Sequence, residues 1–175
     1  HRSRLGDYAQ PMSGARDELV TFPLAPIGVV RSSRAEAIDD DWDAVTSEIV
    51  LDPESVTPAA VAGLAEFSHV DVIFVFDQVD AAKIETGARR PRGNPDWPEV
   101  GILAQRARMR PNRLGVTACR LVGVDGLTIR VNGLDAIEGS PVVDVKPVMK
   151  KFLPRGEVSQ PTWATELMAS YWSRA

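Results

Sequence analysis

The sequence is short of the residues that build disulfides and metal centres. Its 175 residues include one cysteine, Cys119, and two histidines, His1 and His69. One cysteine cannot form an internal disulfide, and three such residues in all cannot supply a multi-cysteine or all-histidine zinc site. We therefore expect no metal. The net charge of −4 and the isoelectric point of about 5.2 also argue against broad affinity for nucleic acids.

Long apolar segments are absent as well. The longest uninterrupted run, Val72–Phe76, is far shorter than the roughly 20 residues that a helix needs to cross a bilayer, so no contact with membranes is expected. No apolar stretch follows the early arginines, so a signal peptide is not expected either. Together with the single cysteine, these absences indicate a cytoplasmic protein.

The familiar catalytic signatures are missing. The sequence contains no G-x-S-x-G, no H-E-x-x-H, no Walker loop and no G-x-G-x-x-G. A composition of 44% hydrophobic and 25% charged residues is nevertheless ordinary for a globular protein of one domain, or of one domain with a small appendage. Any sign of the fold or the function must therefore be sought in local sequence patterns.

Those patterns predict a mainly β protein, either a barrel or a sandwich. Short runs rich in β-branched residues alternate with Gly, Asp and Pro turns, and Asp125-Gly126 is a strong signal for a two-residue hairpin. The apolar centre of residues 70–79 predicts a strand buried on both faces. Strands are expected at residues 27–32, 48–51, 70–79, 101–106, 116–124, 127–131 and 141–147, and helices at residues 58–66 and 163–172.

The chain divides into three expected segments. Residues 1–20 are polar without periodicity and predict a flexible N-terminal tail. Residues 21–152 hold the β domain with its short inserted helix, and residues 153–175 form a C-terminal extension with a helix. Residues 80–100 are expected to form a loop of about 20 residues. Loops of this length in compact domains more often carry a function than serve only as connections.

One basic segment stands out in this acidic chain. Residues 83–120 hold nine basic and three acidic residues, so they carry +6 and the remainder carries −10. Arginine dominates, and its planar fork suits carboxylate or phosphate groups. If residues 105–110 are extended, then Arg106, Arg108 and Arg110 share one side, which favours a bound anion over a solvated face. The anion would be a phosphate or the carboxylate of an amino-acid-like cofactor.

Three further features are candidates for chemistry. Cys119 lies mid-strand and is better explained as a packed residue than as a nucleophile. His69 directly precedes an apolar strand, where a structural hydrogen bond is favoured over proton transfer. The segment Gly133–Gly139 is a glycine-bracketed turn with two carboxylates, Asp135 and Glu138, and it suits a ligand-binding turn and a polar connection equally well.

Four segments together resemble the TsaA-like, or TrmO-like, family of S-adenosylmethionine-dependent β-barrel methyltransferases. The stretch Ala104-x-Arg-x-x-x-Arg-Pro-Asn-x-x-Gly is the most specific of them. The segments are Ile27-Gly-Val-Val-Arg-Ser-Ser, Gly63-Leu-Ala-Glu-Phe-Ser-His-Val-Asp-Val-Ile-Phe-Val-Phe, Gly101 to Thr117, and Leu134-Asp-Ala-Ile-Glu-Gly-Ser-Pro-Val-Val-Asp-Val-Lys-Pro.

The resemblance implies a small single-domain β-barrel that binds S-adenosylmethionine, usually as a homodimer with the cofactor near the subunit interface. The implied activity is methylation of N6 of threonylcarbamoyladenosine in the tRNA anticodon loop. Arg106 would hold the methionine carboxylate and the turn at Gly133 would cradle the adenosine. Carried over onto this sequence, the cofactor-binding residues are Asp77, Gln78, Arg106, Leu114, Gly133, Leu134, Asp135 and Ala136.

The sequence departs from the family pattern in three places. The family commonly has His after the residue matching Phe76, where this chain has Asp77. An acidic stretch, residues 39–43 around Trp42, stands where the family has a Pro-Arg-Gln-Pro-like segment. Longer members carry a further domain after the strand that ends at Pro147, where this sequence continues for about 28 residues. All three differences weigh against tRNA as the acceptor.

Three functions therefore remain open. The chain is a tRNA methyltransferase, a methyltransferase acting on a small metabolite, or a non-catalytic S-adenosylmethionine-binding module. In either enzyme, the candidates for removing the acceptor proton are Asp77 and Asp135. Candidate residues for binding substrate or an anion are Arg89, Arg92, Arg110 and Asn112.

The last expected helix has an apolar face. Trp163, Leu167 and Tyr171 recur at helical spacing and are expected to pack on the barrel or on a partner subunit, in preference to forming a substrate lid.

Overall fold

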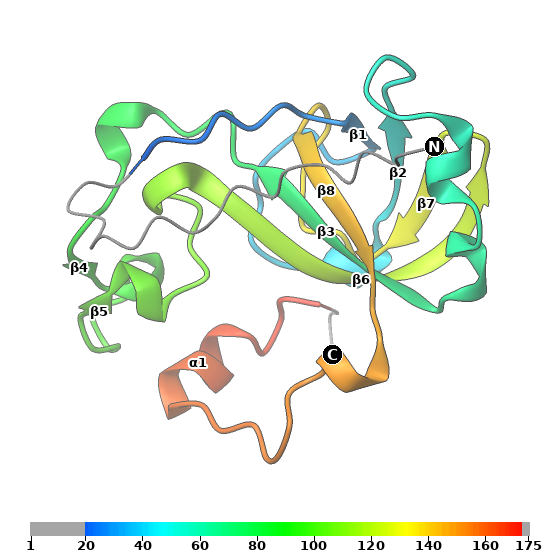
Figure 1. The fold of residues 1–175 in the computed structure, drawn as a ribbon. Coiled ribbons are helices and arrows are strands. Elements are labelled where there is room, and N and C mark those ends of the chain that lie inside the picture. Colours follow the sequence, from blue (N-terminus) through cyan, green and yellow to red (C-terminus); the bar gives the residue numbers. More distant parts are fainter. Residues whose placement is uncertain (1–19, 173–175) are drawn as a thin grey trace, which may run out of the picture.

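A closed barrel of six antiparallel strands forms the centre of the computed structural model, which describes residues 20–172 (Figure 1). The order around the barrel is β1-β2-β7-β6-β3-β8, and β8 pairs back onto β1 to close it. The predicted mainly β barrel is thus confirmed. Its strands are β1 (Gly28–Ser32), β2 (Thr46–Leu51), β3 (His69–Val75), β6 (Leu114–Asp125), β7 (Thr128–Asn132) and β8 (Pro141–Pro147).

Alternating side chains of these strands fill the barrel. In β3, Val70, Val72 and Phe74 are buried, while the residues between them remain partly exposed. The prediction that this strand is buried on both faces is therefore wrong. Gly115 of β6 faces the ring of Phe74, which would overlap any Cβ at that position. The fully buried interior consists of Val30, Ile49, Val70, Val72, Phe74, Cys119, Ile129, Val131, Leu134 and Val142.

The hairpin between β6 and β7 lies where the sequence predicts it. Asp125 pairs with Thr128 across the turn, and Gly126 adopts a φ of 55°. A positive φ at this position is what makes Asp-Gly a favoured hairpin turn. Strand β6 of this hairpin is the longest strand of the barrel, and the candidate site described below lies along it.

Two predicted elements differ in the structure. Residues 58–66 form two 3₁₀ turns, Pro58–Val61 and Leu64–Glu66, because Gly63 between them adopts a left-handed φ of 79°. Residues 101–106 are not a strand. Pairing ends at Gly101, and a 3₁₀ turn, Ile102–Ala104, follows it.

The expected long loop carries a small sheet of its own. Strands β4 (Ala88–Arg89) and β5 (Val100–Gly101) pair antiparallel, on the left of Figure 1. The buried amide of Gln105 donates to the carbonyls of Arg89 and Val100, at 2.9 and 3.0 Å. The loop is therefore tied to Gln105, which begins the segment of residues 105–110.

The C-terminal segment runs below the barrel in Figure 1 and returns to it. Its helix α1 (Thr162–Leu167) is shorter than the helix predicted at 163–172. The amides of residues 41, 42 and 43 donate to the carbonyls of residues 170, 171 and 172. The expected docking on the barrel is confirmed for Tyr171, whose hydroxyl bonds to Asp135, while the packing of Trp163 and Leu167 stays a prediction. Nearly all of the predicted tail at 1–20 lies outside the described residues. None of the described helices has the length and apolarity that a membrane span requires.

Candidate functional site

One group of predicted site residues lies where β3 ends and β6 begins. Asp77 and Gln78 are exposed in the turn that follows β3. Leu114, the first residue of β6, pairs with Val75 of β3. The amide of Phe76 donates to the carbonyl of Arg113 at 2.8 Å, which closes this end of the strand pair. The fold therefore brings Asp77, Gln78 and Leu114 to one end of the barrel.

Arg106 lies against the same strand. Its Nη2 donates a hydrogen bond to the carbonyl of Val116, two residues along β6 from Leu114. The rest of the guanidinium has no hydrogen-bond or ion-pair partner among residues 20–172, and the side chain is exposed. Arg106 is thus held by one contact while its remaining N–H groups are available to an anion.

The turn that begins at Gly133 contributes backbone and one carboxylate. Gly133 has a φ of 79°, and a Cβ there would lie 3.3 Å from Asp43 Oδ1. Leu134 and Ala136 are buried in the barrel, so only their main-chain groups can reach a ligand. The side chain of Asp135 is the polar group that this turn presents.

Both carboxylate oxygens of Asp135 already accept hydrogen bonds. The Thr117 hydroxyl donates to Oδ1 and the Tyr171 hydroxyl donates to Oδ2. Burial and the Asp135 charge raise the pKa of Tyr171, while the Arg106 guanidinium is near enough to act in the opposite direction. Arg106, Asp135 and Tyr171 therefore share one neighbourhood, near the start of β6. Sequence reasoning placed Tyr171 on a docking face but did not link it to Asp135.

The residues proposed for substrate or anion binding are dispersed. Arg92 forms an ion pair with Asp40 at 2.9 Å, and Arg110 donates to the carbonyl of Gln105 at 2.9 Å. Arg89 contacts the sulfur of Met109 at 3.7 Å. Asn112 is exposed with a left-handed φ of 64°.

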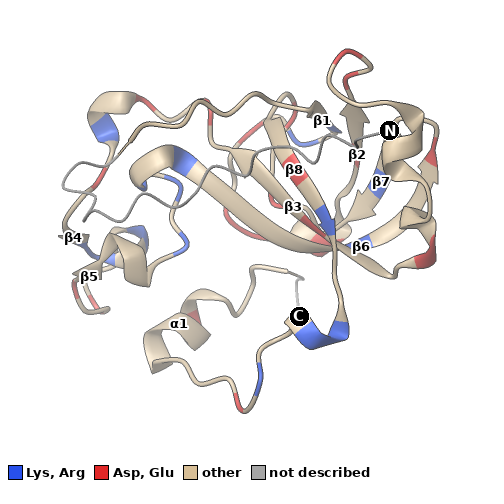
Figure 2. Ribbon diagram, viewed as in Figure 1, with Lys and Arg blue, Asp and Glu red and all other residues tan. Residues whose placement is uncertain are grey.

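The prediction that residues 105–110 form one extended segment is wrong, because no strand forms there and residues 108–110 are bends. Figure 2 shows the basic ribbon positions spread over the segments around β4 and β5 and over the chain after β8. The acidic stretch is also not a free repulsive surface, since Arg92 pairs with its Asp39 and Asp40.

The two residues given structural interpretations behave as expected. Cys119 is fully buried, and burial raises the pKa of its thiol. His69 is exposed at the start of β3, and its Nδ1 lies 2.8 Å from the Ser68 hydroxyl oxygen. Within residues 20–172, no group of three or more His, Cys, Asp or Glu side chains could hold a metal ion.

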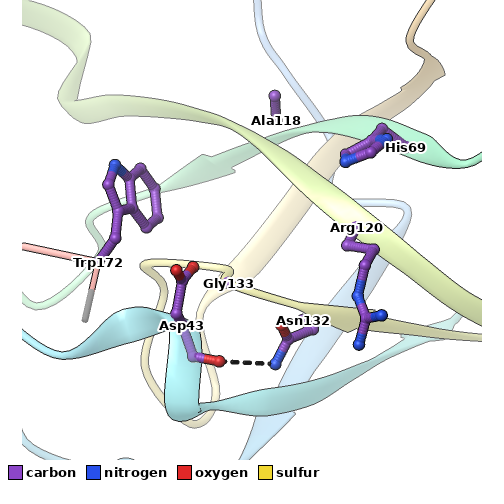
Figure 3. Close-up of a pocket in the computed structure, with 7 residues that line it drawn as sticks. All are labelled: Asp43, His69, Ala118, Arg120, Asn132, Gly133 and Trp172. Atoms are coloured by element: carbon purple, nitrogen blue, oxygen red, sulfur yellow. Dashed lines mark hydrogen bonds between the residues drawn. The ribbon is translucent and has the colours of Figure 1, made fainter. Parts of the chain in front are cut away.

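A surface pocket of about 480 Å³ opens beside the turn at Gly133 (Figure 3). Sequence reasoning did not anticipate it, because its lining comes from five separate segments. Its lining residues are Asp43, His69, Ala118, Arg120, Asn132, Gly133 and Trp172.

These features define a class of protein, a small closed β-barrel with a candidate site along its longest strand. At this site the segment that carries Arg106 meets the turn that begins at Gly133. The family described as the tRNA-methyltransferase O N-terminal domain matches residues 39–152. The chain belongs to this family, as the sequence motifs predict.

Curated relatives are similar over most of this chain. A putative S-adenosylmethionine-dependent methyltransferase, RcsF of Pseudomonas aeruginosa, is 38% identical over 73% of this chain and 55% of its own length. The tRNA (adenine(37)-N6)-methyltransferase of Escherichia coli is 32% identical over 86% of this chain and 69% of its own. A probable S-adenosyl-L-methionine-binding protein of Methanothermobacter thermautotrophicus is 36% identical over 71% of this chain and 88% of its own length.

Solved structures agree with this membership. The crystal structure of TrmO from Pseudomonas aeruginosa has a TM-score of 0.66 and 28% identity, over 81% of this chain and 62% of that one. The chain spans about half the length of the Pseudomonas relative, and only 23% of the human tRNA (adenine(37)-N6)-methyltransferase.

Proposed function

We propose that this protein is an S-adenosylmethionine-dependent methyltransferase that methylates an adenine N6 of tRNA, by resemblance that of threonylcarbamoyladenosine. One observation carries the proposal. Arg106, from the most specific family motif, and the turn of residues 133–136 both attach to adjacent residues of β6, at Val116 and Thr117. Two segments that lie far apart in the sequence, and that both carry residues assigned to the cofactor by the resemblance, therefore converge on one strand.

The residues present fit this cofactor in their chemistry. Arg106 offers unused N–H groups of the kind that pair with a carboxylate. Asp77 and Gln78 offer exposed oxygens to an ammonium group, and Gly133 leaves the turn without a side chain where an adenosine would approach. Leu114 supplies a half-buried apolar surface at the same strand end.

When bound, the cofactor supplies an electrophilic methyl group. The chain contributes alignment of the acceptor and an acceptor for its proton. Asp77 is exposed and its carboxylate has no hydrogen-bond partner among the described residues, so it is the better candidate base. The Asp135 carboxylate instead accepts two hydroxyl hydrogen bonds, so its first role is to position the turn.

The proposal includes an assembly and a location. A homodimer with the cofactor near the interface is supported by the outer face of β6, where Val116 is 44% exposed in the single chain. The barrel domain comprises residues 21–152, and the family match that ends at residue 152 supports this division from an extension of 153–175. A cytoplasmic location is supported by the single cysteine, buried as a thiol.

A second candidate is a cofactor-binding protein without methyl transfer. The name of the Methanothermobacter relative, of whose length this chain covers 88%, favours it. A third candidate is a methyltransferase with a small-molecule acceptor. It is favoured by the ion pair between Arg92 and Asp40, because an arginine paired within the protein is not available to bind RNA phosphates.

Methyl transfer from labelled S-adenosylmethionine distinguishes these functions. Bulk tRNA from a host that lacks the modification, and a metabolite extract from the same host, serve as parallel acceptors. We expect label in tRNA, with transfer falling steeply as salt rises. Label only in the extract would assign a small molecule, and cofactor binding without label in either would assign a binding module.

A further inference from the structure

Two hydroxyl groups from different parts of the molecule hold the carboxylate of Asp135. Thr117 donates from the buried face of β6, and Tyr171 donates from the C-terminal segment, residues 153–172. The Thr117 hydroxyl is fixed, because its strand belongs to the barrel. The Tyr171 hydroxyl reaches Asp135 only while the C-terminal segment is docked. One of the two groups that hold Asp135 is therefore removable.

Tyr171 lies among the residues that the resemblance assigns to the cofactor. Burial and the charge of Asp135 raise the pKa of Tyr171, so its hydroxyl stays protonated and remains a donor. The Arg106 guanidinium acts on this pKa in the opposite direction, which places it near the same hydroxyl. Tyr171 itself lies outside the family match, which ends at residue 152. A residue of the extension therefore contacts one of the assigned cofactor residues and lies near another.

The acidic stretch of residues 39–43 is the docking site of the C-terminal segment. Three successive amides, those of Asp41, Trp42 and Asp43, donate to the carbonyls of residues 170–172. The acidic stretch and the C-terminal segment are two of the three places where this chain departs from the family pattern. Because they bind each other, the two departures form one structural unit.

The long loop of residues 80–100 supports the same unit. The indole N–H of Trp97 donates to Glu166 Oε2 at 2.7 Å, and Arg92 pairs with Asp40 at 2.9 Å. The loop thus contacts both the C-terminal segment and the acidic stretch that receives it. Three segments outside the barrel strands therefore determine where the Tyr171 hydroxyl lies.

Little apolar burial holds the C-terminal segment on the barrel. Helix α1 has no buried residue, and residues 149–162, which connect it to β8 below the barrel in Figure 1, are exposed throughout. Segments with few buried contacts open at a low cost in free energy. Docking is therefore an equilibrium that a ligand bound at the adjoining turn can shift.

We propose that Tyr171 is a positioning residue of the cofactor site. With the C-terminal segment docked, its hydroxyl orients the Asp135 carboxylate and thereby holds the turn of residues 133–136 in the shape that binds S-adenosylmethionine. The inference rests on the proposed function and adds to it a residue from outside the family match. By linkage, a cofactor that binds more tightly when the segment is docked must strengthen docking by the same factor.

The test is a double-mutant cycle on S-adenosylmethionine binding, measured by calorimetry with the full chain. Tyr171→Phe should weaken binding about fivefold, the size expected when one hydrogen bond stabilises the competent shape of the turn. In the Asp135→Ala background the same substitution should have no effect, because Tyr171 acts through Asp135. The matched control is Arg130→Ala, since Arg130 is an arginine of β7 that pairs with Glu48, and it should bind as the wild type does.

Hydrogen exchange of the wild type tests the reciprocal effect without any substitution. Saturating S-adenosylmethionine should slow the amides of Trp42 and Asp43, which report docking, about fivefold. The amides of Ser55 and Val56, which donate to the Asp52 carbonyl in a turn after β2, should be unaffected. If Asp135→Ala does not fold, this measurement decides the inference.

The outcomes separate the two proposals. Unchanged affinity of Tyr171→Phe, beside a wild type that binds the cofactor, would overturn the inference and leave the proposed function standing. Equal losses in both backgrounds would also overturn it, because Tyr171 would then act independently of Asp135. Amides of Trp42 and Asp43 that exchange equally with and without bound cofactor would do the same. A wild type that binds no S-adenosylmethionine would overturn the proposed function and the inference together.

Discussion

The hydrogen bond from Tyr171 to Asp135 should control how firmly the C-terminal segment stays docked. Tyr171→Phe removes the hydroxyl and keeps the ring, so the packing against Trp172, at 5.0 Å between ring centroids, is retained. A hydrogen bond to a charged group contributes about 1.5–3 kcal/mol. Because Tyr171 is only partly buried, the lower figure applies, and about 1.5 kcal/mol corresponds to an undocked population roughly ten times larger.

Three backbone amides report this opening directly. The amides of Asp41, Trp42 and Asp43 donate to carbonyls of residues 170–172, at 3.1, 3.1 and 2.7 Å. In hydrogen exchange, Tyr171→Phe should speed these amides about tenfold and leave the amides of β7 unchanged. The matched control is Phe152→Leu, a change at a side chain directly before the extension that is 86% exposed. Unchanged exchange at all three amides would refute the reasoning.

Three further predictions concern single residues. Gly133→Ala should destabilise the fold by about 1–2 kcal/mol in urea denaturation, because its φ of 79° is left-handed, and an unchanged midpoint would contradict this. The Ser32 amide and the Arg31 guanidinium lower the pKa of Glu138, so the resulting stability is complete above the unfolded carboxyl pKa and is lost as pH falls through the folded pKa. Glu138→Gln should therefore flatten the acid limb of the stability profile, and an identical limb would count against the contact. Cys119 should react with a thiol reagent only in denaturant, since it is fully buried with a raised pKa; rapid labelling of the native protein would show otherwise.

Local chemistry made much of the fold predictable. Asp125-Gly126 fixes the hairpin by its turn preference, and the β-branched runs fix the strands. The failures have local causes too. Residues 58–66 have helical spacing, but Gly63 turns the chain left-handed and splits the segment. Residues 72–76 are apolar throughout, yet barrel strands bury only one face, so Ile73 remains half-exposed.

The candidate site was predictable only in part. The family motif led to Arg106 and to the turn at Gly133. The pocket could not be found this way, because His69 and Arg120 come together through strand register, and Trp172 arrives from a segment that docks by backbone hydrogen bonds. Neither relation leaves a spacing in the sequence.

The most direct test of the account is calorimetric titration of S-adenosylmethionine into the wild type and Arg106→Ala. The account predicts binding to the wild type and at least about tenfold weaker binding to the variant, because one guanidinium–carboxylate contact is lost. Arg130→Ala serves as the control, with binding like the wild type. Equal affinity of the wild type and Arg106→Ala, or no binding to either, would contradict the proposed cofactor site.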